Sequence, residues 1–261
     1  MSSISSTISS TWYTDFFTEL PNEFWRRAVP PWATEAELDF VVRRLGLAAG
    51  SRIVDVPCGS GRHALGLAAR GHRVLGIDVS HEAVGHARRS AAGRGLDVQF
   101  AVGDMRQIPD GEPFDAAVCM GNSFGYLDLD GTREFASALA AAIRPGGGLV
   151  VDFAATAESL LPGWTGAPRT MTTGDITVVT TSAYDVAASR VLSTYEIRRG
   201  EEVFRATALH HVHTCAAIGR LLTDAGFTGI ALFADPDGTP YELGSGRLLL
   251  TATRNPRQPS P

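Results

Sequence analysis

The chain has 261 residues, enough for one large α/β domain or for a domain with an insertion. Its composition is that of an ordinary globular protein, with 44% hydrophobic and 20% charged residues and a formal net charge of −5. Because no stripe of basic residues interrupts this negative balance, we expect no nucleic-acid partner and no attachment to an anionic membrane.

The ends of the chain and the cysteines bound its location. Residues 1–11 are rich in Ser and Thr and are expected to be a disordered tail. The N-terminus lacks the basic and apolar regions of a signal peptide, and no apolar run reaches the about 18 residues of a membrane span. The three cysteines lie far apart and form no C-x-x-C pair. We therefore expect a cytoplasmic protein with reduced thiols and no metal site.

Strand and helix patterns alternate over the first half of the chain. An aromatic-rich helical segment is expected over residues 12–29, followed by a helix over 34–45 in which Thr34 and Glu37 have the spacing of a capping box. Further strands are expected at 51–56, 73–77, 97–101, 114–119 and 148–153, with helices at 61–70, 81–92 and 131–143. This alternation predicts a mostly parallel sheet with helices on both faces.

The pattern changes after the fifth strand. Runs rich in Thr, Val and Tyr predict an antiparallel meander with strands at 175–184, 190–198 and 203–213. Thr214 is then expected to cap a helix that ends at Ala225, with Gly226 just beyond it. Two last strands, at 228–233 and 246–253, are expected to finish the sheet as an antiparallel pair.

A glycine-rich turn follows the first strand of this sheet. The run Gly59-Ser-Gly-Arg-His-Ala64 fits G-x-G-x-x-A. Gly59 permits a tight turn, Gly61 lets a ligand approach the backbone, and the small Ala64 lets the helix pack on the strand. A turn from strand to helix that binds no ligand could have the same sequence. The motif therefore indicates a binding site only together with the acidic residues that follow the next strands.

Two acids and a loop stand at strand ends. Asp78 ends the second strand, where a carboxylate can accept hydrogen bonds from both ribose hydroxyls, although it can also cap the helix that begins near Ser80. After the third strand, Asp104 can accept from the adenine amine while Met105 packs on the ring. The fourth strand ends in the loop 119–126, and open α/β sheets bind ligands at such ends.

The order of these motifs resembles the class I S-adenosylmethionine-dependent methyltransferases, with Arg144-Pro-Gly-Gly-Gly before the fifth strand as a further shared feature. The likeness is strong over 50–154 and looser over 214–253. Asp55 is followed by Val-Pro-Cys where the family usually has a glycine, a variant seen among its small-molecule enzymes. A nicotinamide oxidoreductase could use the same turn, but the Gly-Asp-Met run and the later meander argue against it.

The resemblance implies which residues hold S-adenosylmethionine. Asp55, Gly59, Gly61 and Arg62 would surround its methionine part, and Tyr13 would border the site. The other residues implied for cofactor binding are Asp78 and Val79 at the ribose, Asp104 and Met105 at the adenine, and Met120 and Gly121 at the amino group.

The meander and the aromatic N-terminal segment resemble parts of glycine/sarcosine, amino-sugar and lincosamide N-methyltransferases. The resemblance implies that the N-terminal segment closes over the pocket. We expect Tyr13 as a polar orienting group and Phe124 as an aromatic wall at the transferred methyl. The expected substrate-binding residues are Phe17, Phe24, Trp25, Asn122, Phe124 and Tyr126, although the aromatic residues could equally form a hydrophobic helix face and Asn122 could cap its loop.

Three histidines end the meander. On a strand His211 and His213 share one face, and His210 points the other way. His211 or His213 is expected to act as base or orienting group for the acceptor. Structural histidines and a metal site are the alternatives.

These features together predict a Rossmann-like α/β methyltransferase that transfers a methyl group from S-adenosylmethionine to a small-molecule amine of secondary metabolism. Methylation of carbon or oxygen on an aromatic or indole-type molecule is the alternative, and assembly into a homodimer or larger oligomer stays open. The expected parts are a disordered tail (1–11), an N-terminal helical lid (12–48), the methyltransferase domain (49–155 and 214–254) and an antiparallel β cap (156–213).

Overall fold

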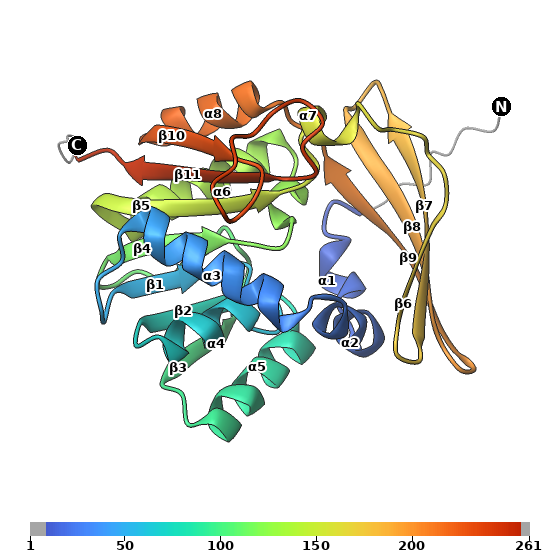
Figure 1. Cartoon of the computed structure of the whole chain (residues 1–261), viewed down its shortest axis with the longest axis horizontal. Helices are drawn as coiled ribbons and strands as arrows, with labels where there is room; N and C mark the ends of the chain where they lie inside the picture. Colours follow the sequence, from blue (N-terminus) through green and yellow to red (C-terminus); the bar gives the residue numbers. More distant parts are fainter. Residues whose placement is uncertain (1–8, 257–261) are drawn as a thin grey trace.

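The structure is a computed structural model that describes residues 9–256. The expected disorder of residues 1–11 falls mostly outside this range. A seven-stranded sheet forms the centre of the molecule, with the strand order β10-β11-β5-β4-β1-β2-β3 (Figure 1). Its strands are β1 (Arg52–Asp55), β2 (Arg73–Asp78), β3 (Val98–Val102), β4 (Phe114–Cys119), β5 (Ile143–Phe153), β10 (Phe227–Phe233) and β11 (Leu248–Arg254).

The predicted fold class is confirmed. Strands β1 to β5 pair in parallel, and β11 pairs antiparallel with both β5 and β10. Side chains alternate between two hydrophobic layers, as the period of a strand requires. In β1, Ile53 packs with Leu38, Leu67 and Val84, whereas Val54 belongs to the other layer.

Helices cover both faces of the sheet. On one face lie α3 (Pro31–Leu45), α4 (Arg62–Ala69) and α5 (His81–Arg94), and on the other lie α6 (Leu129–Ala142) and α8 (Cys215–Asp224). Thr214 caps α8 as predicted, because its side chain accepts a hydrogen bond from the backbone of Ala217. Most element bounds agree with the expected ones to within two residues.

Two expectations about helix and strand ends are wrong. Helix α3 begins at Pro31, since proline fits the first helical position. Thr34 therefore lies inside the helix. Glu37 does not cap the helix N-terminus; its carboxylate pairs with the side chains of Arg62, His63 and Arg247. Strand β5 begins at Ile143, so the run Arg144-Pro-Gly-Gly-Gly lies within an irregular strand rather than before it.

The predicted meander is a four-stranded antiparallel sheet. It contains β6 (Arg169–Thr173), β7 (Ile176–Asp185), β8 (Arg190–Arg199) and β9 (Glu202–His211), in that order, and follows the short helix α7 (Ala157–Leu160). Three strands were predicted, and β6 was missed because Arg169–Thr173 is exposed and lacks the apolar alternation of a half-buried strand. We call this sheet the cap.

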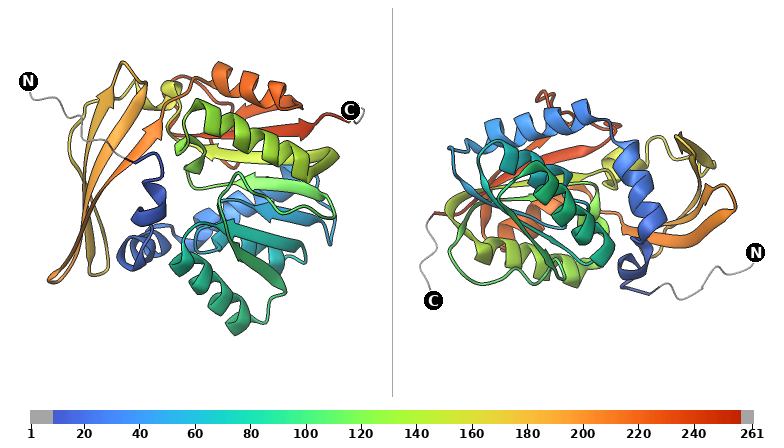
Figure 2. Two further views of the ribbon diagram at one scale, coloured as in Figure 1. Left: turned by 180° about the vertical axis from the view of Figure 1, so that it is seen from behind. Right: turned by 90° about the horizontal axis from the view of Figure 1, so that it is seen from below.

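The short helices α1 (Tyr13–Phe16) and α2 (Glu19–Ala28) lie in the angle between the two sheets (Figures 1 and 2). Leu20 and Phe24 of α2 pack into the cap against Ile176, Val178 and Ile197. The cap and the N-terminal helices are thus joined by one small hydrophobic cluster. This contact places α1 over the carboxyl ends of the central strands.

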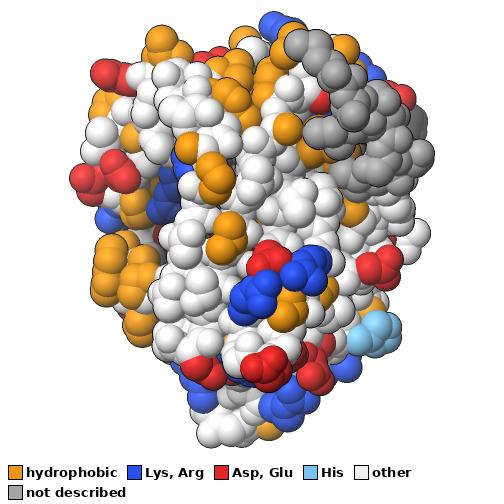
Figure 3. Space-filling model, turned by 90° about the vertical axis from the view of Figure 1, so that its right-hand side faces the viewer, with side chains coloured by type: hydrophobic (Ala, Val, Ile, Leu, Met, Phe, Trp, Pro, Cys, Tyr) orange, Lys and Arg blue, Asp and Glu red, His pale blue; other side chains and the backbone are white. Residues whose placement is uncertain are grey.

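The outer face of the cap has hydrophobic side chains scattered over a mainly polar surface (Figure 3). Glu196 of β8 forms ion pairs with Arg198 and Arg205. Scattered apolar side chains of this kind are ordinary surface features. Over residues 9–256, no helix combines the length and the hydropathy that a bilayer-spanning segment needs.

Candidate active site

A cavity of about 660 Å³ lies between the carboxyl ends of the central strands, the helices α1 and α2, and the inner face of the cap. This volume is within the roughly 300–1,000 Å³ of small-molecule sites. Its walls come from the turn after β1, the end of β2, the loops after β3 and β4, and strands β8 and β9. Segments far apart in the sequence therefore meet around one space.

The glycine-rich turn forms one wall of the cavity. Gly59 and Gly61 have φ values of +53° and +82°, a region that residues with a side chain rarely adopt. A Cβ atom at Gly61 would also lie 3.0 Å from Ala87 and from the ring of Phe100. Gly59 reaches the cavity wall, whereas Gly61 is turned into the packing between helix and strand.

Asp78 lies on the cavity wall at the end of β2, with only 7% of its surface exposed. Its two carboxylate oxygens accept hydrogen bonds from the backbone of Gly59, at 2.7 Å, and of Ser80, at 2.8 Å. Burial raises the pKa of Asp78, and these backbone donors oppose the rise. Each oxygen keeps a second lone pair, so the carboxylate can still accept hydrogen bonds from a vicinal diol. Val79 lines the wall beside it.

Asp55 is placed differently from its expected role. It is 1% exposed and does not line the cavity; one oxygen accepts from the backbone of Ala64 at 3.0 Å, and the other has no partner among residues 9–256. Burial raises the pKa of Asp55 to about 7. Its observed task is to hold the first turn of α4 against β1, where the positive end of a helix favours a carboxylate.

Asp104 also lies behind the wall, whereas its neighbour Met105 lies on it. The Arg106 guanidinium forms two hydrogen bonds with Asp104, of 2.8 and 2.9 Å, and keeps the pKa of that carboxyl below its usual range. Tyr13 of α1 lies nearby and lines the cavity, and its buried hydroxyl has no hydrogen-bond partner within the described chain. Burial raises the pKa of Tyr13.

The loop after β4 supplies Met120, Gly121 and Asn122 to the wall, as expected. The backbone amide of Gly121 donates to Asp152 at 3.1 Å. Asn122 has a φ of +68°, and its side-chain oxygen accepts from the backbone of Ala154 at 2.8 Å. The Asn122 side chain thus ties the loop to the end of β5, which is the loop-capping alternative.

Part of the cavity wall is aromatic. The ring of Trp12 lies 4.8 Å from that of Tyr126, and the rings of Tyr13 and Phe17 stack on Tyr126 with centroids 6.0 Å away. Tyr195 of the cap lies 5.2 Å from Phe16, ring centroid to ring centroid. We call this part of the wall the aromatic chamber; its residues are Trp12, Tyr13, Phe16, Phe17, Tyr126, Tyr195 and His210.

Of the three histidines at the end of the meander, His210 is the one that lines the cavity. Its ring lies 5.1 Å from that of Tyr126 and 5.8 Å from that of Trp12, and burial lowers its pKa to about 4. His211 and His213, the expected pair, do share the other face of the strand end, but they do not line the cavity. The His213 ring packs near Phe153, and its buried Nε2 has no partner in the described chain. The alternation of side chains along the strand places His210 on one face and His211 and His213 on the other. The packing of the cap then turns the His210 face toward the cavity.

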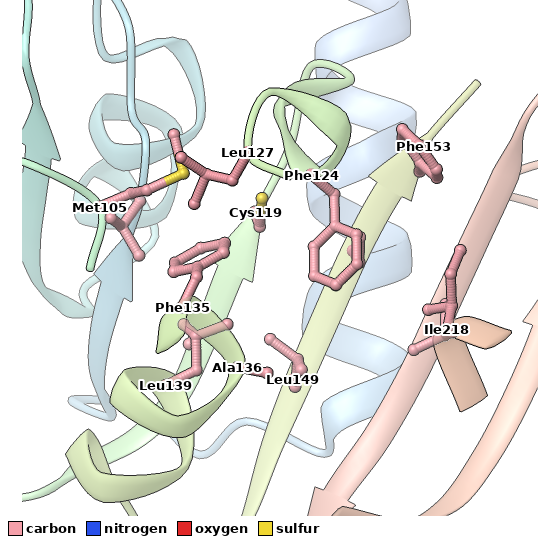
Figure 4. Close-up of a cluster of buried hydrophobic side chains, with 14 of the residues drawn as sticks. Met105, Cys119, Phe124, Leu127, Phe135, Ala136, Leu139, Leu149, Phe153 and Ile218 are labelled. Carbon is pink, nitrogen blue, oxygen red and sulfur yellow. The ribbon is translucent and has the colours of Figure 1, made fainter. Parts of the chain in front are cut away.

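Two expected substrate-binding phenylalanines are core residues. Phe124 is 1% exposed and packs against Phe135 and Phe153, as Figure 4 shows. Phe24 is fully buried in the contact between α2 and the cap. Neither residue reaches the cavity, because each points into a hydrophobic layer. Phe17, Trp25 and Tyr126 do line it, as expected.

Several cavity residues were not predicted from the sequence, and the residues with polar or aromatic side chains matter most. The aromatic run around Tyr13 was a usable signal for Trp12 and Phe16, but strand register alone offered none for Tyr195 or His210. The main additions to the wall are Trp12, Phe16, Asn22, Arg26, Thr34, His63, Tyr195 and His210. Within the described residues, no three His, Cys, Asp or Glu side chains are grouped so as to hold a metal ion.

The cavity has the groups that a nucleoside with an amino-acid tail requires. Asp78 offers acceptors for ribose hydroxyls, Met105 offers an apolar surface for a base, and Arg62 offers a cation for a carboxylate. These groups and the seven-stranded sheet with its antiparallel β11 define a class I S-adenosylmethionine-dependent methyltransferase domain. Residues 53–147 match the family model of a methyltransferase domain.

The chain is distantly related to N-methyltransferases that act on small molecules. It is 35% identical to dTDP-3-amino-3,6-dideoxy-alpha-D-glucopyranose N,N-dimethyltransferase from Streptomyces fradiae. The aligned region has 161 residues and covers 60% of each chain. It is 30% identical over 115 residues to rat (Rattus norvegicus) glycine N-methyltransferase, or 39% of each chain. The chain thus matches only part of the length of these curated relatives.

Solved structures share the fold over nearly the whole chain. The CcbJ methyltransferase from Streptomyces caelestis superposes with a TM-score of 0.79 at 18% identity, over 92% of this chain and 98% of that one. At this identity the likeness shows the architecture alone, including the cap and the N-terminal helices.

Proposed function

We propose that the protein transfers a methyl group from S-adenosylmethionine to an amine nitrogen of a small molecule. The observation that carries the proposal is one cavity lined by Asp78, by Met105 and by the aromatic chamber. A donor and an acceptor can react only where they share such a space. The N-methyltransferases among the relatives support nitrogen as the acceptor atom.

The side chains of the cavity support this chemistry by position and by exclusion of water. When bound, S-adenosylmethionine supplies a methyl group on a sulfonium centre, open to in-line attack. The rings of Trp12 and Tyr126 shield the chamber from water and favour a cationic group on their faces. An attacking amine must be neutral. The uncharged imidazole of His210 can accept a hydrogen bond from the amine N–H and orient the nitrogen, and the methylated product then loses its proton to water.

Calorimetric titration with S-adenosylhomocysteine tests the cofactor, and release of S-adenosylhomocysteine from S-adenosylmethionine with a panel of amines tests the reaction. We expect binding and turnover with at least one amine. A wild-type protein that binds neither form of the cofactor would refute the proposal.

His210 is expected to matter more for turnover than its neighbour on the strand. With any amine that the wild type methylates, His210→Ala should lower kcat by about tenfold, the loss of one orienting hydrogen bond, and leave S-adenosylhomocysteine affinity unchanged. His211→Ala is the matched control, because His211 lies outside the cavity. Equal losses in the two variants would contradict the assignment.

The N-terminal helices are expected to act as a lid over the cofactor. Arg26 of α2 bonds to Glu82 and to Ser60, each at 3.1 Å, and Asn22 donates to Glu82 at 2.6 Å. Arg26→Ala should speed the dissociation of S-adenosylhomocysteine about threefold to tenfold, since a half-buried ion pair contributes on the order of 1 kcal/mol. Stopped-flow displacement measures this rate. Arg27→Ala, which removes pairs to Glu23 and Asp175 only, should not change it.

Methylation of oxygen or carbon on an aromatic acceptor is a second candidate. The aromatic chamber favours it, because flat apolar molecules pack well against aromatic side chains such as those of Trp12, Tyr126 and Tyr195. Phenols and indoles in the acceptor panel separate the two candidates. We also propose a cytoplasmic location, supported by the three free cysteines of the described chain, and leave the oligomeric state to size-exclusion measurements.

A further inference from the structure

Glu37 is a buried carboxylate beside the cavity whose partners come from two distant parts of the chain. It lies on α3 with 3% of its surface exposed. One oxygen accepts from Arg62 and lies 2.9 Å from His63 Nε2, at the start of α4. The other accepts from Arg247, just before β11, at 2.6 Å. A carboxylate buried to this degree is costly unless it is fully paired, so the partners and Glu37 fix one another.

Two guanidinium groups, of Arg62 and Arg247, face Glu37. Burial alone would raise the pKa of Glu37, but the hydrogen bond from His63 and the charge of Arg62 hold it well below its usual range. Burial lowers the pKa of His63 to about 4, so its imidazole is uncharged at neutral pH. Asp152 lies 3.6 Å from Arg247 and is a second carboxylate beside that guanidinium, which leaves Arg62 with Glu37 as its one carboxylate partner within residues 9–256.

Arg62 is the charged member of the cluster that lines the cavity, so its guanidinium can pair with an anionic group of a ligand. It lines the cavity, and 32% of its side chain is exposed. Its contacts with Glu37 and with the hydroxyl of Thr34 both use Nη1. Nη2 and Nε have no protein partner within residues 9–256 and can form a two-point contact with a carboxylate.

We propose that Glu37 is a positioning residue that aims the Arg62 guanidinium at the amino-acid end of the methyl donor, so that the cavity prefers the complete donor over a truncated thionucleoside. The inference rests on the proposed function, because it concerns the same cavity. Glu37 fixes one edge of the guanidinium and leaves the other edge directed at the ligand. An arginine side chain without such an anchor loses much of its orientation, since it has many rotamers.

A purely electrostatic role would have the opposite effect. The negative charge of Glu37 repels a ligand carboxylate, so its removal would raise the affinity if orientation did not matter. The sign of the change therefore separates positioning from charge tuning.

The test compares S-adenosylhomocysteine with 5′-methylthioadenosine, which lacks the amino-acid part, by calorimetry on the full chain. Arg62→Gln and Glu37→Gln should each lower S-adenosylhomocysteine affinity about tenfold or more, the loss of one charge-assisted contact. Both variants should bind 5′-methylthioadenosine within about twofold of the wild type, because this ligand lacks the amino-acid part that Arg62 is proposed to hold. Glu37→Gln should add nothing in the Arg62→Gln background, because it acts through Arg62.

Asp39→Asn is the matched control on α3, because Asp39 is exposed and pairs with Arg70 away from the cavity wall. If Glu37→Gln does not fold, Thr34→Val removes the other Arg62 anchor and should weaken S-adenosylhomocysteine binding alone. Unchanged or tighter binding of S-adenosylhomocysteine by Glu37→Gln, equal losses for both ligands, or an additive loss with Arg62→Gln would each overturn the inference. A wild type that binds neither ligand would refute the proposed function instead.

Discussion

Replacing Asp78 by Asn is expected to lower the affinity for S-adenosylhomocysteine by about 100-fold. The two oxygens of Asp78 already accept from Gly59 and Ser80, and the carboxylate, which lines the cavity, can accept further hydrogen bonds. An amide keeps the shape but turns one acceptor into a donor, so it loses charge-assisted hydrogen bonds worth about 1.5–3 kcal/mol each. Isothermal titration calorimetry measures the loss.

The control for this variant is Asp97→Asn, which changes an exposed acid just before β3 that does not line the cavity. It should bind S-adenosylhomocysteine like the wild type. Circular dichroism of both variants checks that the turn after β1 still folds. An Asp78→Asn protein with wild-type affinity would show that the ribose hydroxyls are held elsewhere.

Replacing Phe124 by Ala is expected to lower the free energy of unfolding by about 3–5 kcal/mol, the usual cost of deleting a buried aromatic ring. The ring is 1% exposed and packs within 6.2 Å of the Phe135 ring and 6.0 Å of the Phe153 ring, centroid to centroid. The cavity left behind would be fully enclosed by hydrophobic side chains (Figure 4). Urea denaturation followed by fluorescence measures the change.

Phe124→Leu provides the comparison, because it keeps most of the buried volume and should cost less than about 1.5 kcal/mol. Under the core assignment Phe124→Leu should methylate any accepted amine at nearly the wild-type rate. A stable Phe124→Leu protein with turnover reduced about 100-fold would instead return Phe124 to the aromatic wall at the transferred methyl.

The residues expected to hold the cofactor were predictable where their positions depend on neighbours in the sequence. Gly59 lies in the turn after β1 and Asp78 ends β2, and the ends of these adjacent parallel strands meet at one edge of the sheet. Asp55 and Asp104 follow the same pattern, yet each found a nearer partner in the first turn of α4 or in Arg106. The sequence spacing identifies an acidic residue at a strand end, but it does not identify the group that donates a hydrogen bond to it.

The aromatic chamber was less predictable, because it is built from contacts between segments that are distant in the sequence. The alternation of β9 separated His210 from His211 and His213, but the choice of inner face depends on how the cap packs against α1. The aromatic residues near the N-terminus divided in the same way: Phe24 entered the cluster with the cap, whereas Phe17 remained at the cavity.

Glu37 shows the same limit in one residue. Its distance from Thr34 fits a capping box, but Pro31 moves the helix start one turn earlier and leaves Glu37 on the buried side. There it joins Arg62 and Arg247, which are 25 and 210 residues away in the chain. No local pattern encodes a pair of that separation.

The sequence by itself determined the order of strands and helices, the glycine-rich turn and the acid at the end of β2, because hydrophobic period and backbone freedom act over a few residues. Only the tertiary structure decided that His210 faces the cavity, that Phe124 belongs to the core and that Glu37 holds Arg62. Each of these depends on which surfaces exclude water together, and that outcome belongs to the whole fold.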